Sequence, residues 1–243
     1  MRETNDGFNR GEQSAPGTAP KARNASRRAR PVELRAPGRI ALIDASPEAH
    51  RPTAGAVLDD FADALAAYAR SSSSTAPDMI RIAADSGDRP SAFDAVVIAC
   101  SLTPDAPLAL QSIACERALL GCALEPHVRA YAVAISDTYE PEQACDALLA
   151  FESICDASRI IWCGGVAIGA GSLIARTRKS PRMGTLRRAR SQAIDRLIAA
   201  VRLGTNVDQA LELAGGAGNP ASTDILTVPC PLPRFLYRHI AKA

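Results

Sequence analysis

Long apolar runs are absent from this sequence. Its longest apolar stretches fall far short of the ~20 residues that a helix needs to cross a bilayer. The first residues also lack the apolar segment of a secretory signal. The sequence therefore predicts a cytoplasmic protein without a membrane contact.

Clustered metal ligands and paired cysteine motifs are missing as well. The seven cysteines are odd in number and none forms C-x-x-C, while His50, His127 and His239 lie far apart. Zinc and iron–sulfur sites use ligands at characteristic short spacings, and an odd cysteine count in a cytoplasmic chain argues against a disulfide framework. We expect no metal site, and we interpret most of the cysteines as small core side chains.

The first 37 residues contain few side chains that could build a core. Phe8, Val32 and Leu34 are their large apolar residues, whereas eight basic and four acidic side chains fall within them. Such a segment buries too little apolar surface to offset its conformational entropy. We expect a disordered basic tail over 1–37 and one domain over 38–243. A basic tail can contact nucleic acid or anionic lipid, but a solvated extension explains it more simply, and we expect no specific nucleic-acid partner.

From residue 39 onward, short apolar runs alternate with segments of helical spacing. Strands are expected at 39–44, 79–83, 95–100, 129–135 and 159–163, the last of them ended by Gly164 and Gly165. Helices are expected at 57–68, 104–120, 141–151, 193–201 and 207–213. This alternation predicts an α/β fold, a three-layer sandwich in which helices cover both faces of a five-stranded parallel sheet. Five such strands suit a flavodoxin-like order, with a ligand crevice at the carboxyl ends of the central strands.

Several loops carry a more specific pattern. The segments are Leu42-Ile43-Asp44-Ala45-Ser46-Pro47 followed by Thr53-Ala54-Gly55-Ala56-Val57-Leu58, then Ser101-Leu102-Thr103-Pro104, Ile135-Ser136-Asp137-Thr138-Tyr139-Glu140, Trp162 to Gly171, and Pro233-Arg234-Phe235-Leu236-Tyr237. In these segments the chain resembles the flavodoxin-like NAD(P)H-dependent oxidoreductases, also called the NADPH-dependent FMN reductase family. The resemblance covers roughly residues 39–239.

The resemblance implies a bound FMN that accepts hydride from NAD(P)H and passes electrons to a small-molecule or protein acceptor, often in a homodimer. It implies that Ser46, Thr53 and Gly55 lie at the FMN phosphate. It also implies that the ring lies between two loops, one with Leu102 and Thr103 and one with Asp137, Thr138 and Tyr139. No side chain need act as a catalytic acid or base, because the flavin itself carries the hydride chemistry.

The first loop departs from the family pattern where the phosphate should bind. Ala45 replaces a glycine, Glu48 replaces a basic residue, and Pro52 and Ala54 replace two hydroxyl residues. Losing two hydrogen bonds to a charged group costs roughly 3–6 kcal/mol. His50 and Arg51 could compensate as cationic donors. The first expected function is therefore an FMN-dependent NAD(P)H oxidoreductase. The alternative is a non-catalytic flavodoxin-like scaffold or interaction module that has lost tight FMN binding.

Three further features have simpler interpretations. The basic segment 176–190 could capture a nucleotide phosphate or nucleic acid, but a solvated basic face explains it more simply. The glycines between 164 and 171 lack the spacing of a dinucleotide fingerprint, so turning and close packing explain them. Ser46 follows a strand as a nucleophile elbow does, yet its flanking residues do not match that motif.

Near the carboxyl terminus, Phe235 and Leu236 are expected to dock into the core. The alternative is that Tyr237 and Arg238 line the flavin crevice or a dimer contact.

Overall fold

The structure is a computed structural model that describes residues 34–83, 92–103, 115–117, 119, 127–216 and 224–241. All of these belong to one unit, Val32–Ala243. The predicted tail over 1–37 therefore lies mostly outside the described residues. Most of the helix expected over 104–120 also lies outside them. Within the described part, Pro37 is buried and the carbonyl of Arg35 lies against Gly204.

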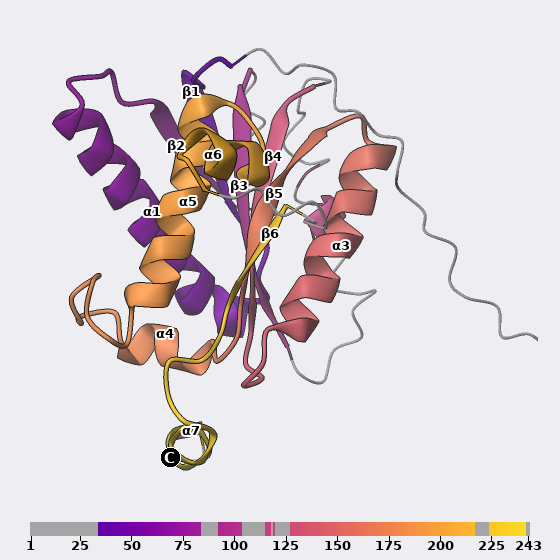
Figure 1. Cartoon of the computed structure of the whole chain (residues 1–243). Coiled ribbons are helices and arrows are strands. Elements are labelled where there is room, and N and C mark those ends of the chain that lie inside the picture. The colour runs from indigo at the N-terminus through magenta and orange to yellow at the C-terminus, as the bar shows by residue number, and fades with distance from the viewer. Residues whose placement is uncertain are drawn as a thin grey trace, which may run out of the picture. The chain divides into compact units, whose positions relative to one another are not determined.

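A parallel sheet forms the centre of this unit (Figure 1). Its strands are β1 (Arg39–Asp44), β2 (Asp78–Ala83), β3 (Ala95–Leu102), β4 (Arg129–Ser136), β5 (Ile161–Ile168) and β6 (Ile225–Val228). They lie in the order β2-β1-β3-β4-β5-β6, and every neighbouring pair is parallel. The α/β class and the parallel sheet are confirmed.

The predicted count of five strands is wrong, because β6 adds a sixth strand at the free edge of β5. This strand has only four residues, and three of them are half-buried or exposed. Four residues are too few to show a clear apolar periodicity in the sequence. The strand forms because it pairs with β5.

Helices cover both faces of the sheet (Figure 1). The helices of the described part are α1 (Arg51–Ser71), α3 (Glu142–Ala157), α4 (Ser172–Arg176), α5 (Arg188–Leu203), α6 (Val207–Leu213) and α7 (Arg234–Ala241), of which α4 and α7 lie near the strand ends. Alternate residues of each strand point to opposite faces. In β1, Ile40 and Leu42 pack with α1 and α5, whereas Ala41 and Ile43 pack on the side of α3.

The prediction that the fifth strand ends at Gly164 and Gly165 is wrong, because β5 continues to Ile168. The register against β4 shifts between Ala130 and Ala132, so β5 carries an extra residue there. Gly164 has φ 109°, and a β-carbon on Gly165 would lie 2.6 Å from the carbonyl of Ala132. Glycine therefore permits an irregular strand and a close approach at this point, rather than ending the strand.

Candidate functional site

The loops that follow β1, β3, β4 and β5 lie at one edge of the sheet, because all four strands are parallel. In Figure 1 this is the edge nearest α4 and α7. The residues predicted to contact FMN follow β1, β3 and β4 at this edge. Their individual contacts decide whether the edge suits a flavin.

Ser46 holds the loop after β1 to the end of β3. Its side chain is buried, and its hydroxyl accepts a hydrogen bond from the backbone N–H of Ser101 over 2.9 Å. The backbone N–H of Ser46 in turn donates to Oδ1 of Asp44 over 2.9 Å. The backbone N–H of Ser46 is thus used within the protein, and its hydroxyl is held in place by Ser101 while keeping its own proton to donate.

A carboxylate faces the first turns of α1. A β-carbon added at Gly55 would lie 3.9 Å from Oδ2 of Asp44. Glu48 is also close in sequence and begins the short 3₁₀ turn η1 (Glu48–His50). Two carboxylates near the start of a helix oppose the favourable field that the helix N-terminus offers to an anion.

The backbone at the start of α1 is also committed. The N–H groups of His50 and Arg51 both donate to the carbonyl of Pro47, over 2.9 and 3.1 Å. Pro52 has no N–H to donate. Ala54 is fully buried in the core, so this position faces away from the crevice. Thr53 is half-buried in the same turn.

Of the ring-contacting residues predicted after β3, the structure describes Leu102 and Thr103. Leu102, the last residue of β3, is buried in the core on the α3 side, together with Ile43 and Leu119. Thr103 follows it and is half-buried. Beyond Thr103, residues 104–114 lie outside the described part of the chain.

The loop after β4 is held by its own hydrogen bonds. The hydroxyls of Ser136 and Thr138 lie 2.7 Å apart, and the Thr138 hydroxyl donates to the carbonyl of Glu140 over 2.7 Å. Asp137 approaches the first loop, since its Oδ2 lies 4.0 Å from Nδ1 of His50. The structure therefore brings the first and third loops together through this pair.

Tyr139 packs against the carboxyl-terminal segment. Its hydroxyl donates to the carbonyl of Leu232 over 2.8 Å, and its ring centroid lies 5.5 Å from that of Tyr237. The guanidinium of Arg234 lies 5.3 Å above the same ring and 3.2 Å from the Glu140 carboxylate. The aromatic ring expected to contact a flavin is thus packed between side chains of this protein.

The prediction that Phe235 and Leu236 dock into the core is wrong. Phe235 is 71% exposed and Leu236 is 41% exposed, so neither docks into the core. Tyr237 of α7 is buried instead, and its hydroxyl donates to the carbonyl of Asp137. Tyr237 forms a small cluster of its own with Ala170 and Leu173, separate from the two main cores. The segment folds over the loops because its tyrosine finds acceptors there.

Glycines bring the loop after β5 against the loop after β4. A β-carbon on Gly169 would lie 2.8 Å from the Tyr139 carbonyl, and one on Gly171 would lie 2.8 Å from Oδ1 of Asp137. The backbone N–H of Gly171 donates to the carbonyl of Ser136 over 2.9 Å. These glycines serve close packing, as the sequence indicated.

The buried cysteines of the central strands are not activated nucleophiles. Cys100 lies in β3 and is buried. A hydrogen bond with Cys115, together with burial, holds the pKa of Cys100 well above its ordinary value. Burial likewise raises the pKa of Cys163 to about 12. Thiols of this kind stay protonated and unreactive near neutral pH.

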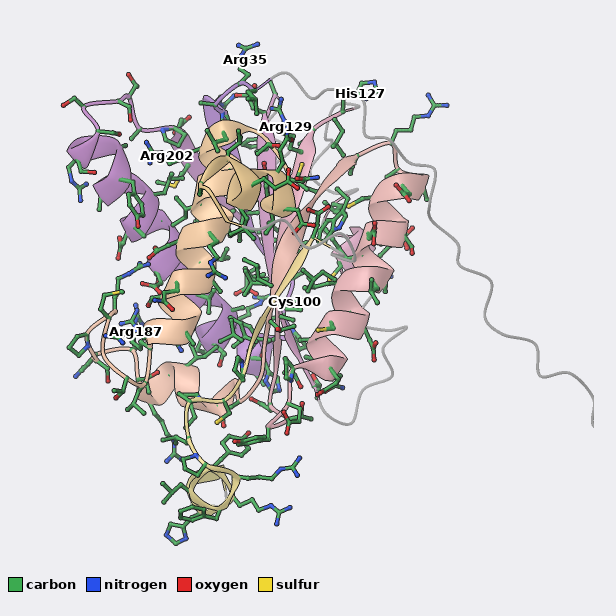
Figure 2. The ribbon with its side chains drawn as sticks, viewed as in Figure 1. Arg35, Cys100, His127, Arg129, Arg187 and Arg202 are labelled. Carbon is green, nitrogen blue, oxygen red and sulfur yellow. The ribbon has the colours of Figure 1, made fainter. Side chains whose placement is uncertain are left out.

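A separate pocket of about 670 Å³ lies beside α1, away from the strand ends. One wall is the basic segment that precedes α5, where Figure 2 labels Arg187. Arg182 contacts Asp60 over 2.8 Å and Asp195 over 2.6 Å, and Arg187 contacts Asp60 over 2.9 Å. Arg182 and Arg187 therefore belong to an ion-paired clasp that fastens this segment to α1 and α5, rather than to a solvated basic face.

The sequence did not identify the residues that close the crevice. Asp44 was visible only as the polar end of a strand, and Tyr237 was offered only as an alternative to the docking of Phe235 and Leu236. No group of three or more His, Cys, Asp or Glu residues suited to a metal ion is found in the described ranges. Among the same residues, no helix is long and apolar enough to cross a membrane.

Comparisons with models of known protein families, with curated proteins and with solved structures give no match for this chain.

Proposed function

We propose that this chain is a flavodoxin-like interaction module that has lost tight FMN binding. The strand order β2-β1-β3-β4-β5 supports the flavodoxin-like part of this proposal, since it is the order of that fold. The sixth strand extends the sheet beyond β5 without changing the positions of the four strands that border the crevice.

The observation that carries the proposal is the position of Asp44. Its carboxylate faces Gly55, at the point where the resemblance places the FMN phosphate. At an effective dielectric constant of about 20, two unit charges of like sign about 5 Å apart repel by roughly 3 kcal/mol. A phosphate dianion at this position would meet that repulsion without the backbone N–H groups of Ser46, His50 and Arg51, which already donate to Asp44 and Pro47.

The ring side of the crevice supports the same proposal. Tyr139 contacts Tyr237, Arg234 and Leu232, all from the carboxyl-terminal segment. A flavin would have to displace these contacts before it could lie against the loop after β4. The residues of the described site therefore do not fit FMN, and we assign no chemical step to it.

The absorbance of the purified protein tests this proposal. We expect a colourless preparation that shows no flavin bands and that does not accelerate the oxidation of NADH or NADPH when FMN is added. A yellow preparation with bound FMN would overturn the proposal. Released flavin should be identified after denaturation, so that a contaminant in the preparation is not mistaken for a ligand.

The second candidate is an FMN-dependent NAD(P)H oxidoreductase with an unidentified small-molecule or protein acceptor, acting as a homodimer. The observation in its favour is that Ser46 and Asp137 lie in loops that meet through the His50–Asp137 pair. The side chains of Thr53, His50 and Arg51 would then have to bind the phosphate. Oxidation of NADPH or NADH that requires added FMN, and that Thr53→Ala weakens, would favour this candidate over the first.

A further inference from the structure

Arg190, in the first turn of α5, is a buried cation. It is only 8% exposed, although arginine side chains normally keep their charged group in water. Its Nη1 and Nη2 both lie 3.4 Å from the hydroxyl oxygen of Thr177. Among the described residues, this is the acceptor that the structure gives to its guanidinium, and the distances are long for hydrogen bonds.

The carboxylates near Arg190 are paired with other arginines. Arg182 and Arg187 share the carboxylates of Asp60 and Asp195 in the ion-paired clasp. Arg190 forms no ion pair with either carboxylate, although the charge of Asp60 partly favours its charged form. Burial and the neighbouring Arg187 outweigh that effect and lower the pKa of Arg190 to about 10, which leaves it charged at neutral pH. A buried guanidinium that is not paired with a carboxylate is unfavourable.

A small cavity of about 20 Å³ lies beside this guanidinium. Its walls are largely aliphatic or proline side chains, with Arg190 and Thr177 as its polar members; they include Ile174, Leu186, Val228 and Pro231. The cavity has room for one water-sized particle. A phosphate or sulfate is too large for it and needs more donors than Arg190 and Thr177 provide.

We propose that this cavity binds a single chloride ion, which Arg190 holds as a counter-ion. A monatomic anion of this size accepts hydrogen bonds from any direction, so the two terminal nitrogens of Arg190 can both donate to it. It also gives Arg190 a paired counter-charge where α4, α5 and the segment after β6 meet. This site is separate from the crevice at the strand ends and does not depend on the function proposed for that crevice.

The test compares thermal unfolding in sodium chloride and in sodium gluconate at equal ionic strength, so that general screening is matched. We expect the midpoint to rise with chloride by about 4 °C and then to level off, as it does for a ligand that binds only the folded state. Arg190→Met should remove this dependence on chloride. Arg188→Met, an exposed arginine two residues earlier, should retain it.

A second measurement does not depend on whether the variants fold. Crystals of the unaltered protein grown with sodium bromide should show an anomalous scattering peak next to Arg190. No chloride dependence in the unaltered protein, an equal dependence in Arg190→Met, or a water in place of the bromide peak would each overturn the proposal.

Discussion

The hydroxyl of Ser46 accepts a hydrogen bond from the backbone N–H of Ser101 over 2.9 Å, and this bond ties the loop after β1 to the end of β3. The same hydroxyl is the one that the sequence assigns to a flavin phosphate. A side chain that is buried and bonded in this way contributes to stability in the absence of any ligand.

Ser46→Ala should therefore lower the free energy of unfolding by about 1–3 kcal/mol, because it leaves the buried N–H of Ser101 without its acceptor. Urea unfolding is the measurement. Ser153→Ala is the matched control, since the Ser153 hydroxyl is exposed and donates to a carbonyl of its own helix. The control should change stability by less than about 0.5 kcal/mol. Equal effects from the two variants would contradict a bridging role for Ser46.

The carboxyl-terminal helix should respond very differently at neighbouring positions. Tyr237→Ala should cost about 2–3 kcal/mol, because it removes a buried ring and the hydrogen bond to the Asp137 carbonyl. Phe235→Ala should be within about 0.5 kcal/mol of the unaltered protein, since Phe235 is exposed. Urea unfolding of both variants decides the point. A larger loss from Phe235→Ala than from Tyr237→Ala would show that α7 packs through its other face.

Gly164 should be far less tolerant of alanine than Gly215, although both have positive φ. An added β-carbon at Gly164 would lie 2.5 Å from the Asp224 carbonyl, whereas at Gly215 it would meet nothing within 4 Å. Gly164→Ala should cost more than about 3 kcal/mol, from strain and a backbone clash together. Gly215→Ala should cost about 1 kcal/mol from strain alone. Similar losses in thermal unfolding would mean that β5 is not irregular at Gly164.

Asp224 gives the protein a defined pH dependence. Burial raises the pKa of its carboxyl from 3.8 to about 6, against a smaller opposing effect of its hydrogen bond from the Asp208 N–H. Between about pH 4 and pH 6 the unfolded chain releases this proton while the folded chain keeps it. The unfolded state then binds fewer protons, so this group's contribution to stability falls as pH rises.

Asp224→Asn removes that titration and keeps an acceptor for the Asp208 N–H. Asparagine also suits the positive φ of 56° at this position. The stability of the variant relative to the unaltered protein should increase from pH 4 to pH 7 by about 1–2 kcal/mol, allowing for solvent screening. Urea unfolding at a series of pH values measures the difference. A difference that stays constant, or that falls with pH, would contradict a raised pKa.

Local patterns were sufficient for much of the fold. The buried residues Val57, Leu58, Phe61 and Leu65 of α1 have the spacing that predicted this helix. Gly204 ends α5 with φ 62°, as a glycine at that position indicated. Such features depend on nearby residues, so the sequence displays them directly.

Features that depend on distant residues could not be predicted in this way. The four-residue strand β6 exists because β5 offers an edge, and the continuation of β5 through Gly164 depends on the carbonyl of Asp224. In the crevice, the ring of Tyr139 packs against the ring of Tyr237, which lies almost one hundred residues later in the sequence. A resemblance in loop sequence names the residues of a site, but it does not say which partners have already occupied them.

Fluorescence titration of FMN into the protein tests the central claim most directly. The account predicts no saturable quenching below about 10 µM FMN. It also predicts at least about tenfold tighter binding by the double variant Asp44→Asn, Glu48→Gln, which removes both negative charges but keeps an oxygen acceptor for the Ser46 N–H. Submicromolar binding of FMN by the unaltered protein, with no gain in the variant, would contradict the account.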